Sequence, residues 1–244
     1  MIQGFFQGIA FLLQGFSLIT QKNIRGFVVI PLIINIVIFC GAIWLANVQF
    51  DLWMDKLLGW LPSWLSWVEW LLYPFFAVLI LLVIYYTFSI VANFIAAPFN
   101  ALLAERVEKV LEGRPLPETS GWKAMAKNIG STLTSEVKKV IYMIKWMPLL
   151  LIITVIPGVN LIAPLAWLIY GSWMYSLQYT DFPMGNHEMF IKEELDVLRK
   201  NRAHALGFGA ATSLITIVPV LNFVAMPVAV SGATAMWVKR LSNG

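Results

Sequence analysis

Charged residues are scarce in this chain of 244 residues. Asp, Glu, Lys and Arg make up 12% of the sequence, whereas hydrophobic residues make up 59% and the mean hydropathy is +0.77. An average soluble domain has about twice that share of charge. The composition therefore excludes an ordinary soluble domain and predicts an integral membrane protein.

Cysteine and histidine are also rare. The single cysteine, Cys40, excludes an intrachain disulfide, and its position inside an apolar run predicts a buried thiol. Of the two histidines, His187 lies near Asp181 and Glu188 in the string DFPMGNHE. A full set of metal ligands is missing there, so a turn is the preferred interpretation.

The chain also lacks the common catalytic motifs. It has no Walker A string, GxGxxG loop, HExxH helix or CxxC pair, so we expect no enzyme activity, no cofactor and no nucleic-acid partner. The longest apolar runs contain no Asp, Glu, Lys, Arg or His, so the carboxylate relay of proton-coupled carriers is not visible. We therefore expect transport by passive conduction, or transport coupled to an energy source by a route that the sequence does not reveal.

Two apolar runs are long enough to cross a bilayer, which takes about 20 residues of helix. They predict one long transmembrane helix at 24–50 and a second at 71–104. The second run contains Asn93, Pro98 and Asn100 in its later half, so we expect a break there. The predicted fold class is an all-α integral membrane protein.

Residues 1–20 predict an additional helix before the first span. Gln3, Gln7 and Gln14 fall on one side of this helix, within roughly 40° of one another, and the rest is largely apolar. An uncharged polar stripe of this kind is typical of a helix at the membrane interface or of one packed on neighbouring helices.

The distribution of Lys and Arg predicts the topology. Every Lys and Arg except Lys56 lies outside residues 51–70, so the positive-inside rule places that segment on the outer side. The remaining apolar regions, 148–180 and 205–238, must then return to the side from which they start. We expect two helical hairpins that enter only part of the bilayer, because their first arms are short; the alternative is four more strained spans.

Proline turns mark the tips of both predicted hairpins. A shift of 62 residues along the chain superimposes Pro157 on Pro219 and Asn160 on Asn222. Proline-broken apolar segments at corresponding positions point to a transport pathway. The asparagines could line that pathway, but capping of the turns is the preferred interpretation.

Residues 105–147 form the main polar segment. A helix is predicted to end at Gly113, and a Pro-rich linker follows it. A basic amphipathic helix comes next, with Lys123, Lys127 and Lys138 apart from its apolar stripe. This helix either lies along the cytoplasmic membrane surface or packs on the hairpins. The apolar stripe comprises Trp122, Met125, Ile129, Leu133, Val137, Ile141 and Ile144.

Lys22 and Arg25 directly precede the first long apolar run. If Asn23 is the N-cap, the amides of Ile24, Arg25 and Gly26 are unpaired donors in the first helical turn. A cation at this end opposes the helix dipole, and a bound oxyanion would remove the mismatch. Gly26 permits close approach. Positive-inside charge alone explains the same residues equally well, so both interpretations stay open.

Two further features refine this hypothesis. Pro31 is expected to break the helix just beyond the site. No acidic residue precedes Asp51, so the site offers donors only. Sulfate at neutral pH has only acceptors and fits such a site, although phosphate is not excluded.

Several strings along the chain resemble the CysZ family, the bacterial inner-membrane sulfate permeases. The resemblance implies sulfate uptake for cysteine biosynthesis, two long transmembrane helices, two hairpins that penetrate part of the membrane, and homo-oligomers whose protomers can insert in opposite orientations. The charge bias predicts one orientation instead. The strings are IRGFVVIPLIINI at 24–36, IAAPFNALLAE at 95–105, QYTDFPMGNH at 178–187 and TSLITIVPVLNFVAMPVAVSGATAMWV at 212–238.

The resemblance also implies a sulfate site at the start of the first long helix. The family pattern there is similar to GLNxR, and this chain reads QKNIR, so Asn23 and Arg25 correspond while Gln21 and Lys22 depart. Some relatives have a second basic residue where this chain has Gly26.

We therefore expect a multi-pass sulfate permease of the bacterial inner membrane, with sulfate, the lipid bilayer and further copies of the chain as partners. Asn23, Ile24, Arg25 and Gly26 are the expected sulfate-binding residues. Two alternatives are a permease for another oxyanion, such as sulfite or thiosulfate, and a membrane scaffold that does not transport but assembles with a partner transporter.

Overall fold

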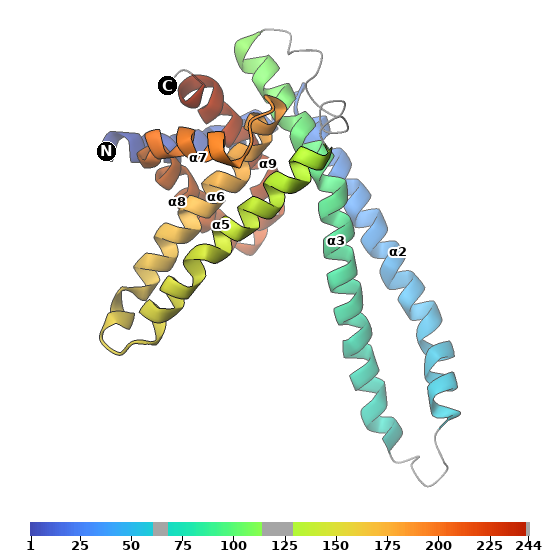
Figure 1. Cartoon of the computed structure of the whole chain (residues 1–244). Helices are drawn as coiled ribbons and strands as arrows, with labels where there is room; N and C mark the ends of the chain where they lie inside the picture. The colour runs from blue at the N-terminus through green and yellow to red at the C-terminus, as the bar shows by residue number, and fades with distance from the viewer. Residues whose placement is uncertain (61–67, 114–128, 243–244) are drawn as a thin grey trace. The chain divides into compact units, whose positions relative to one another are not determined.

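The computed structural model describes residues 1–60, 68–113 and 129–242, and these ranges are helical apart from short connections (Figure 1). The all-α prediction is confirmed. The elements in chain order are α1 (Ile2–Ile19), α2 (Arg25–Leu58), α3 (Glu69–Glu112), α5 (Ile129–Val155), the 3₁₀ turn η2 (Val159–Ile162), α6 (Ala163–Asn186), α7 (Ile191–Lys200), α8 (Arg202–Ile217), α9 (Pro219–Met236) and the π-helical η3 (Trp237–Leu241).

Several of these helices have the length and composition of membrane spans. Four candidates occur within the described ranges: Ile2–Ile19, Arg25–Leu58, Trp70–Phe88 and Pro219–Leu241. Their apolar windows match what a hydrocarbon core requires of a helix. The protein is therefore an all-α integral membrane protein.

The chain divides into two compact units. The two-helix unit is Val29–Ala97, and the main unit combines Met1–Val28 with Pro98–Gly244. Within the two-helix unit, α2 and α3 contact each other through the rings of Phe39 and Phe88, whose centroids are 4.9 Å apart. Cys40 is exposed, so the prediction of a buried thiol is wrong.

Large apolar side chains cover the outside of the two-helix unit. A helix that is apolar all round needs an apolar environment, and lipid is the available one. The prediction that Cys40 is buried was wrong for the same reason, because residues of an apolar run in a spanning helix face lipid as readily as protein. Exposed members include Ile33, Val37, Trp44, Leu45, Leu81 and Val83.

Several prolines lie inside continuous helices, and three of them concern predicted helix breaks or boundaries. α2 runs through Pro31, α3 runs through Pro98 and Asn100, and α5 runs through Pro148. The predicted breaks at Pro31 and in the later half of the second span are therefore wrong. Proline removes a single intrahelical hydrogen bond, and apolar surroundings offer the other backbone groups no water, so the helix is retained.

The ends of α3 and α5 revise the predicted polar segment. α3 ends at Glu112, and Gly113 adopts a φ of 65°, which confirms the predicted helix end. α5 begins at Ile129 and continues to Val155, so residue 147 is not a helix boundary. Trp122, Lys123, Met125 and Lys127 lie outside the described residues.

The described part of the amphipathic stripe is not packed against the protein. Val137, Ile141 and Ile144 are exposed, as is Lys138 on the same helix. Of the two interpretations offered by the sequence, contact with lipid fits this exposure and packing on the hairpins does not.

Close backbone contacts hold the main unit together. α1 packs on α8 and α9, and α6 packs on the same two helices. A Cβ built on Gly207 would lie 1.9 Å from the carbonyl oxygen of Phe5, and one on Gly209 would lie 1.7 Å from that of Ser172. Glycine is required at these crossings because any side chain would separate the helices.

Two residues of the polar stripe of α1 contact neighbouring helices. Gln7 Oε1 lies 2.9 Å from His204 Nε2, and Gln14 Oε1 accepts a hydrogen bond from Lys239 Nζ at 3.0 Å. Packing on neighbours, one of the two interpretations of the stripe, is therefore observed. The core beneath α1 contains fully buried Leu12, Phe208 and Met236.

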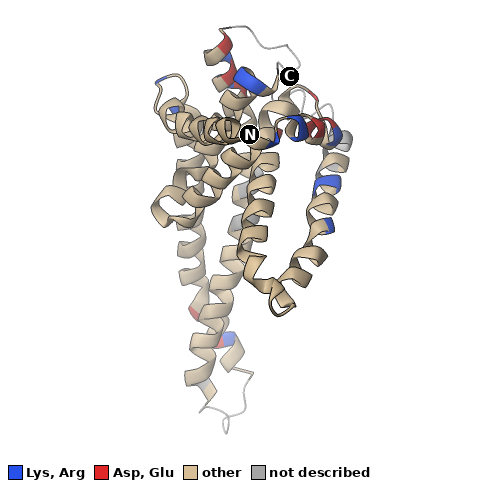
Figure 2. Ribbon diagram, turned by 90° about the vertical axis from the view of Figure 1, so that its left-hand side faces the viewer, with Lys and Arg blue, Asp and Glu red and all other residues tan. Residues whose placement is uncertain are grey.

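Two helical hairpins complete the main unit. α5 and α6 form the first, with η2 at its turn, and α8 and α9 form the second (Figure 1). Residues 146–180 and 203–238 contain no Asp, Glu, Lys or Arg. In Figure 2 the charged residues of the main unit accordingly lie away from the hairpin turns. This polarity suits hairpins that enter an apolar phase from one side.

Candidate anion site at the start of α2

The chain turns sharply between α1 and α2. The carbonyl oxygen of Gln21 accepts hydrogen bonds from the amides of Ile24 and Arg25, each at 2.9 Å. α2 therefore begins at Arg25, so Asn23 does not occupy the N-cap position on which the site hypothesis was conditional. Of the three amides predicted to be unpaired, only that of Gly26 lacks an acceptor among the described residues.

Burial of one side chain fixes the orientation of this turn. Ile24 is fully buried and belongs to the core of the main unit. Arg25, which follows it, is exposed and has no hydrogen bond or ion pair with the described part of the chain. A Cβ built on Gly26 would meet nothing within 4 Å. Within the described chain, a guanidinium without a hydrogen-bond or ion-pair partner thus adjoins, in sequence, an amide without an acceptor.

Arg106 contacts this turn, which the sequence did not predict. Its Nε donates to the backbone carbonyl of Asn23 at 3.1 Å. Arg106 lies in the last two turns of α3, and its partner Asn23 lies 83 positions earlier in the chain. A long-range contact of this kind leaves no trace in local periodicity.

The carboxylate of Glu108, two residues after Arg106 on α3, is engaged elsewhere. Residues two apart on a helix project about 200° from each other, so Glu108 points away from the side of Arg106. Its Oε1 lies 2.7 Å from Nε2 of His187, in the turn that follows α6. This hydrogen bond raises the pKa of His187, although burial opposes the shift. The predicted turn position of His187 is observed, and its pairing is new.

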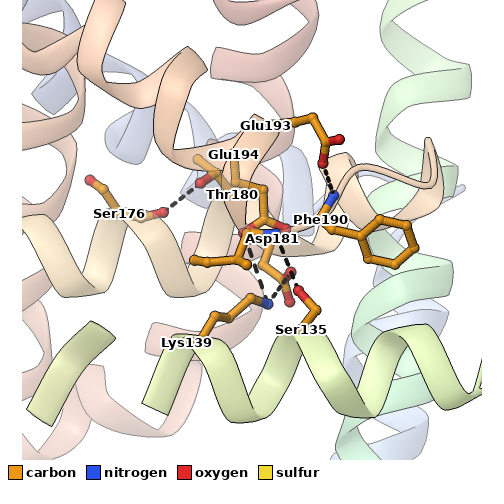
Figure 3. Close-up of polar contacts among 9 residues, drawn as sticks. Ser135, Lys139, Ser176, Thr180, Asp181, Phe190, Glu193 and Glu194 are labelled. Carbon is orange, nitrogen blue, oxygen red and sulfur yellow. Dashed lines mark hydrogen bonds and ion pairs between the residues drawn. The ribbon is translucent and has the colours of Figure 1, made fainter. Parts of the chain in front are cut away.

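A buried ion cluster joins three helices of the main unit (Figure 3). Lys139 of α5 forms an ion pair with Asp181 of α6, and its Nζ lies 4.0 Å from Oε2 of Glu194 on α7. The side chains of Lys139 and Glu194 are 9% and 1% exposed. Because its charge is used internally, Lys139 is a structural residue and not a free anion ligand.

The hairpin tips present apolar side chains outward. Pro157, Asn160, Pro219 and Asn222 are all exposed, as are large neighbours such as Leu161 at 83%. Neither asparagine side chain hydrogen-bonds to the described residues, and the N-cap positions are Gly158 and Val218. The preferred capping interpretation is therefore wrong, and a part in the pathway stays a prediction.

The fold and the site together define a class of protein. The described chain is an all-helical membrane protein that places an unpaired guanidinium beside an open helix start. Such a site suits a small anion that crosses or reaches the membrane surface.

The chain belongs to the family described as Sulfate transporter CysZ/Etoposide-induced protein 2.4, whose sequence profile matches residues 11–227. It is 42% identical over 237 residues to "Sulfate transporter CysZ" of Pectobacterium atrosepticum, covering 97% of this chain and 86% of that protein. It is 42% identical over 233 residues to the protein of that name from Pseudomonas syringae pv. tomato, covering 96% and 92%. The Pseudomonas fluorescens relative is 41% identical over 233 residues, covering 96% and 93%. The resemblance seen in the strings is confirmed.

Proposed function

We propose that this protein is a sulfate permease that admits sulfate across the bacterial inner membrane for cysteine biosynthesis. The observation that carries the proposal is similarity over nearly the whole chain to relatives named sulfate transporters. The family is named for a transporter and not for an enzyme. The exposed, unpaired Arg25 supports the same conclusion, because a dianion needs a cationic donor where it enters.

Sulfate binds at the start of α2. Arg25 supplies a guanidinium fork and Gly26 supplies its free amide, while the side chain of Asn23 is exposed beside them. Arg106 holds the carbonyl of Asn23 and has further N–H groups for the anion. It thereby replaces the second basic residue that some relatives have at the position of Gly26. Ile24 anchors the turn through its buried side chain.

The hairpins form the inner part of the pathway. Their uncharged arms and exposed apolar tips suit partial insertion into the bilayer, with Pro157, Asn160, Pro219 and Asn222 at the deepest points. Lipid cannot pair the backbone groups of such turns. In a homo-oligomer, contact with another copy of the chain would shield the backbone groups of these turns from lipid. The charge bias favours one orientation for all copies.

Flux into liposomes tests the proposal. Purified protein should admit labelled sulfate, and Arg25→Gln should weaken sulfate binding by roughly ten- to a hundredfold, because a charge-assisted hydrogen bond is lost. Lys192→Gln is the matched control, since Lys192 is exposed on α7 and the sequence reasoning assigns it no ligand. Unchanged sulfate binding by Arg25→Gln would show that the site assignment is wrong.

Two other functions give different results in the same assay. A permease for sulfite or thiosulfate would bind those anions more tightly than sulfate in competition. A non-transporting scaffold would give no flux with any of the three anions and would co-purify with a partner transporter. Absence of flux with intact Arg25-dependent binding would favour the scaffold.

A further inference from the structure

A polar cavity of about 530 Å³ lies in the main unit, apart from the start of α2. It forms where the beginning of α1, the junction of α7 with α8, and η3 meet. Its lining contains the basic side chains of Lys200, Arg202 and Arg240 and no carboxylate. The residues that line it are Met1, Gln3, Gly4, Gln7, Lys200, Asn201, Arg202, Ala203, His204 and Arg240.

These three cations have no compensating partner within the described ranges. None of them forms an ion pair or hydrogen bond with the described residues. All three side chains are exposed around one hollow, so their like charges together produce a positive potential at its mouth. Burial and then Arg240 lower the pKa of His204, which also lines the cavity, in agreement with a positive local potential.

The backbone adds further donors to the same cavity. α8 begins at Arg202, so the amides of Arg202, Ala203 and His204 belong to its first turn, where intrahelical acceptors are lacking. The side chain of Asn201 makes no capping hydrogen bond to them, and its Nδ2 donates to the carbonyl of Val197. The first turn of α8 also contains no acidic residue. The positive end of the helix dipole therefore remains unpaired at the cavity.

We propose that this cavity binds a tetrahedral oxyanion group, with the phosphate of an anionic phospholipid as the favoured source. Lys200, Arg202 and Arg240 supply charge, and the first turn of α8 supplies amides. Ile2 and Phe6 of α1 are 77% and 63% exposed next to the cavity-lining Gln3 and Gln7. These apolar side chains lie where acyl chains would accompany a bound headgroup. A free phosphate or sulfate ion offers the same headgroup chemistry without the chains.

Two triple variants of the full chain test the proposal. The cavity variant is Lys200→Gln, Arg202→Gln, Arg240→Gln. The control variant is Lys138→Gln, Lys145→Gln, Lys192→Gln, which removes the same charge from exposed lysines outside the cavity. Phosphatidylglycerol and phosphatidylcholine retained by the purified proteins are counted by native mass spectrometry. Sulfate binding at Arg25 serves as the check that each variant is folded.

The cavity variant should retain phosphatidylglycerol about tenfold less than the parent and the control variant, with phosphatidylcholine unaffected. A second arm uses inorganic phosphate and sulfate in an Arg25→Gln background, which removes the first site. A similar loss of affinity there, without a change in lipid retention, would support the cavity as a site for the free ion. If the cavity and control variants behave alike in both arms, the proposal is overturned.

Discussion

Nε of Arg106 donates to the backbone carbonyl of Asn23 at 3.1 Å, although the two residues are 83 positions apart. The contact ties the last turns of α3 to the turn that presents Arg25. Arg106 has no other hydrogen bond or ion pair with the described residues. Since a guanidinium has five N–H donors, one contact to the backbone leaves the remaining four for a ligand.

Arg106→Gln is therefore expected to weaken sulfate binding by about tenfold, and Arg106→Lys should restore it only in part, because an ammonium lacks the planar fork. Isothermal titration with sulfate measures both variants. Lys109→Gln is the matched control, as Lys109 is an exposed cation on the same helix. Parental affinity in Arg106→Gln would leave Arg106 as a structural anchor only.

The close crossing of α6 and α8 at Gly209 predicts how substitution there changes stability. A Cβ on Gly209 would lie 1.7 Å from the carbonyl oxygen of Ser172, so Gly209→Ala must separate the helices and should cost about 1–3 kcal/mol or more. A Cβ on Gly185 of α6 would meet nothing within 4 Å, so Gly185→Ala should be neutral or slightly stabilising. Thermal unfolding in detergent compares them. Equal melting of Gly209→Ala and the parent would contradict the close approach.

The sequence predicted the helical class and both long helices because apolar run length alone specifies them. It also placed the end of α3 correctly, since Gly113 needs a left-handed conformation that glycine adopts freely. Proline misled it. Pro31, Pro98 and Pro148 lie inside helices, whereas Pro157 and Pro219 lie at the hairpin turns. The residue type is the same, and the tertiary surroundings decide between the two outcomes.

The candidate site was predictable only in part. Arg25 could be selected because a cation at a helix start is electrostatically misplaced. The carbonyl of Gln21 accepts hydrogen bonds from two of the amides that were expected to be available for an anion. No side-chain pattern in the sequence predicts that turn. Arg106 and Glu108 were equally hidden, because their partners Asn23 and His187 are distant in the chain.

The pair of His187 and Glu108 predicts how stability depends on pH. The hydrogen bond raises the pKa of His187 in the folded protein. The associated stability is fully present below the ordinary histidine pKa of about 6.5 and is lost as pH rises through the raised value. The melting temperature of the parent should therefore fall over that window, and His187→Gln should remove this fall.

His204 provides the comparison, since burial and Arg240 lower its pKa. Its contribution has the opposite sign: stability is present above about pH 6.5 and is lost as pH falls through the lowered value. His204→Gln should leave the decline at higher pH in place. Melting curves from about pH 5 to about pH 9 separate the two histidines. A decline that persists in His187→Gln would assign it to other groups.

Gly26 allows the binding of the anion to be separated from the stability of the fold. A Cβ built there meets no atom within 4 Å, so Gly26→Ala should not reduce the melting temperature, and alanine's helix propensity should add about 0.5–1 kcal/mol. The same methyl group would stand beside the amide of Gly26, which has no acceptor among the described residues, and would hinder an oxyanion from reaching it. Sulfate affinity should therefore fall several-fold while stability is kept. Gly185→Ala is the control that gains helix propensity without approaching the site. If Gly26→Ala bound sulfate as tightly as the parent, the amide of Gly26 would not be a ligand, and the side chains of Arg25 and Arg106 would have to hold the anion without it.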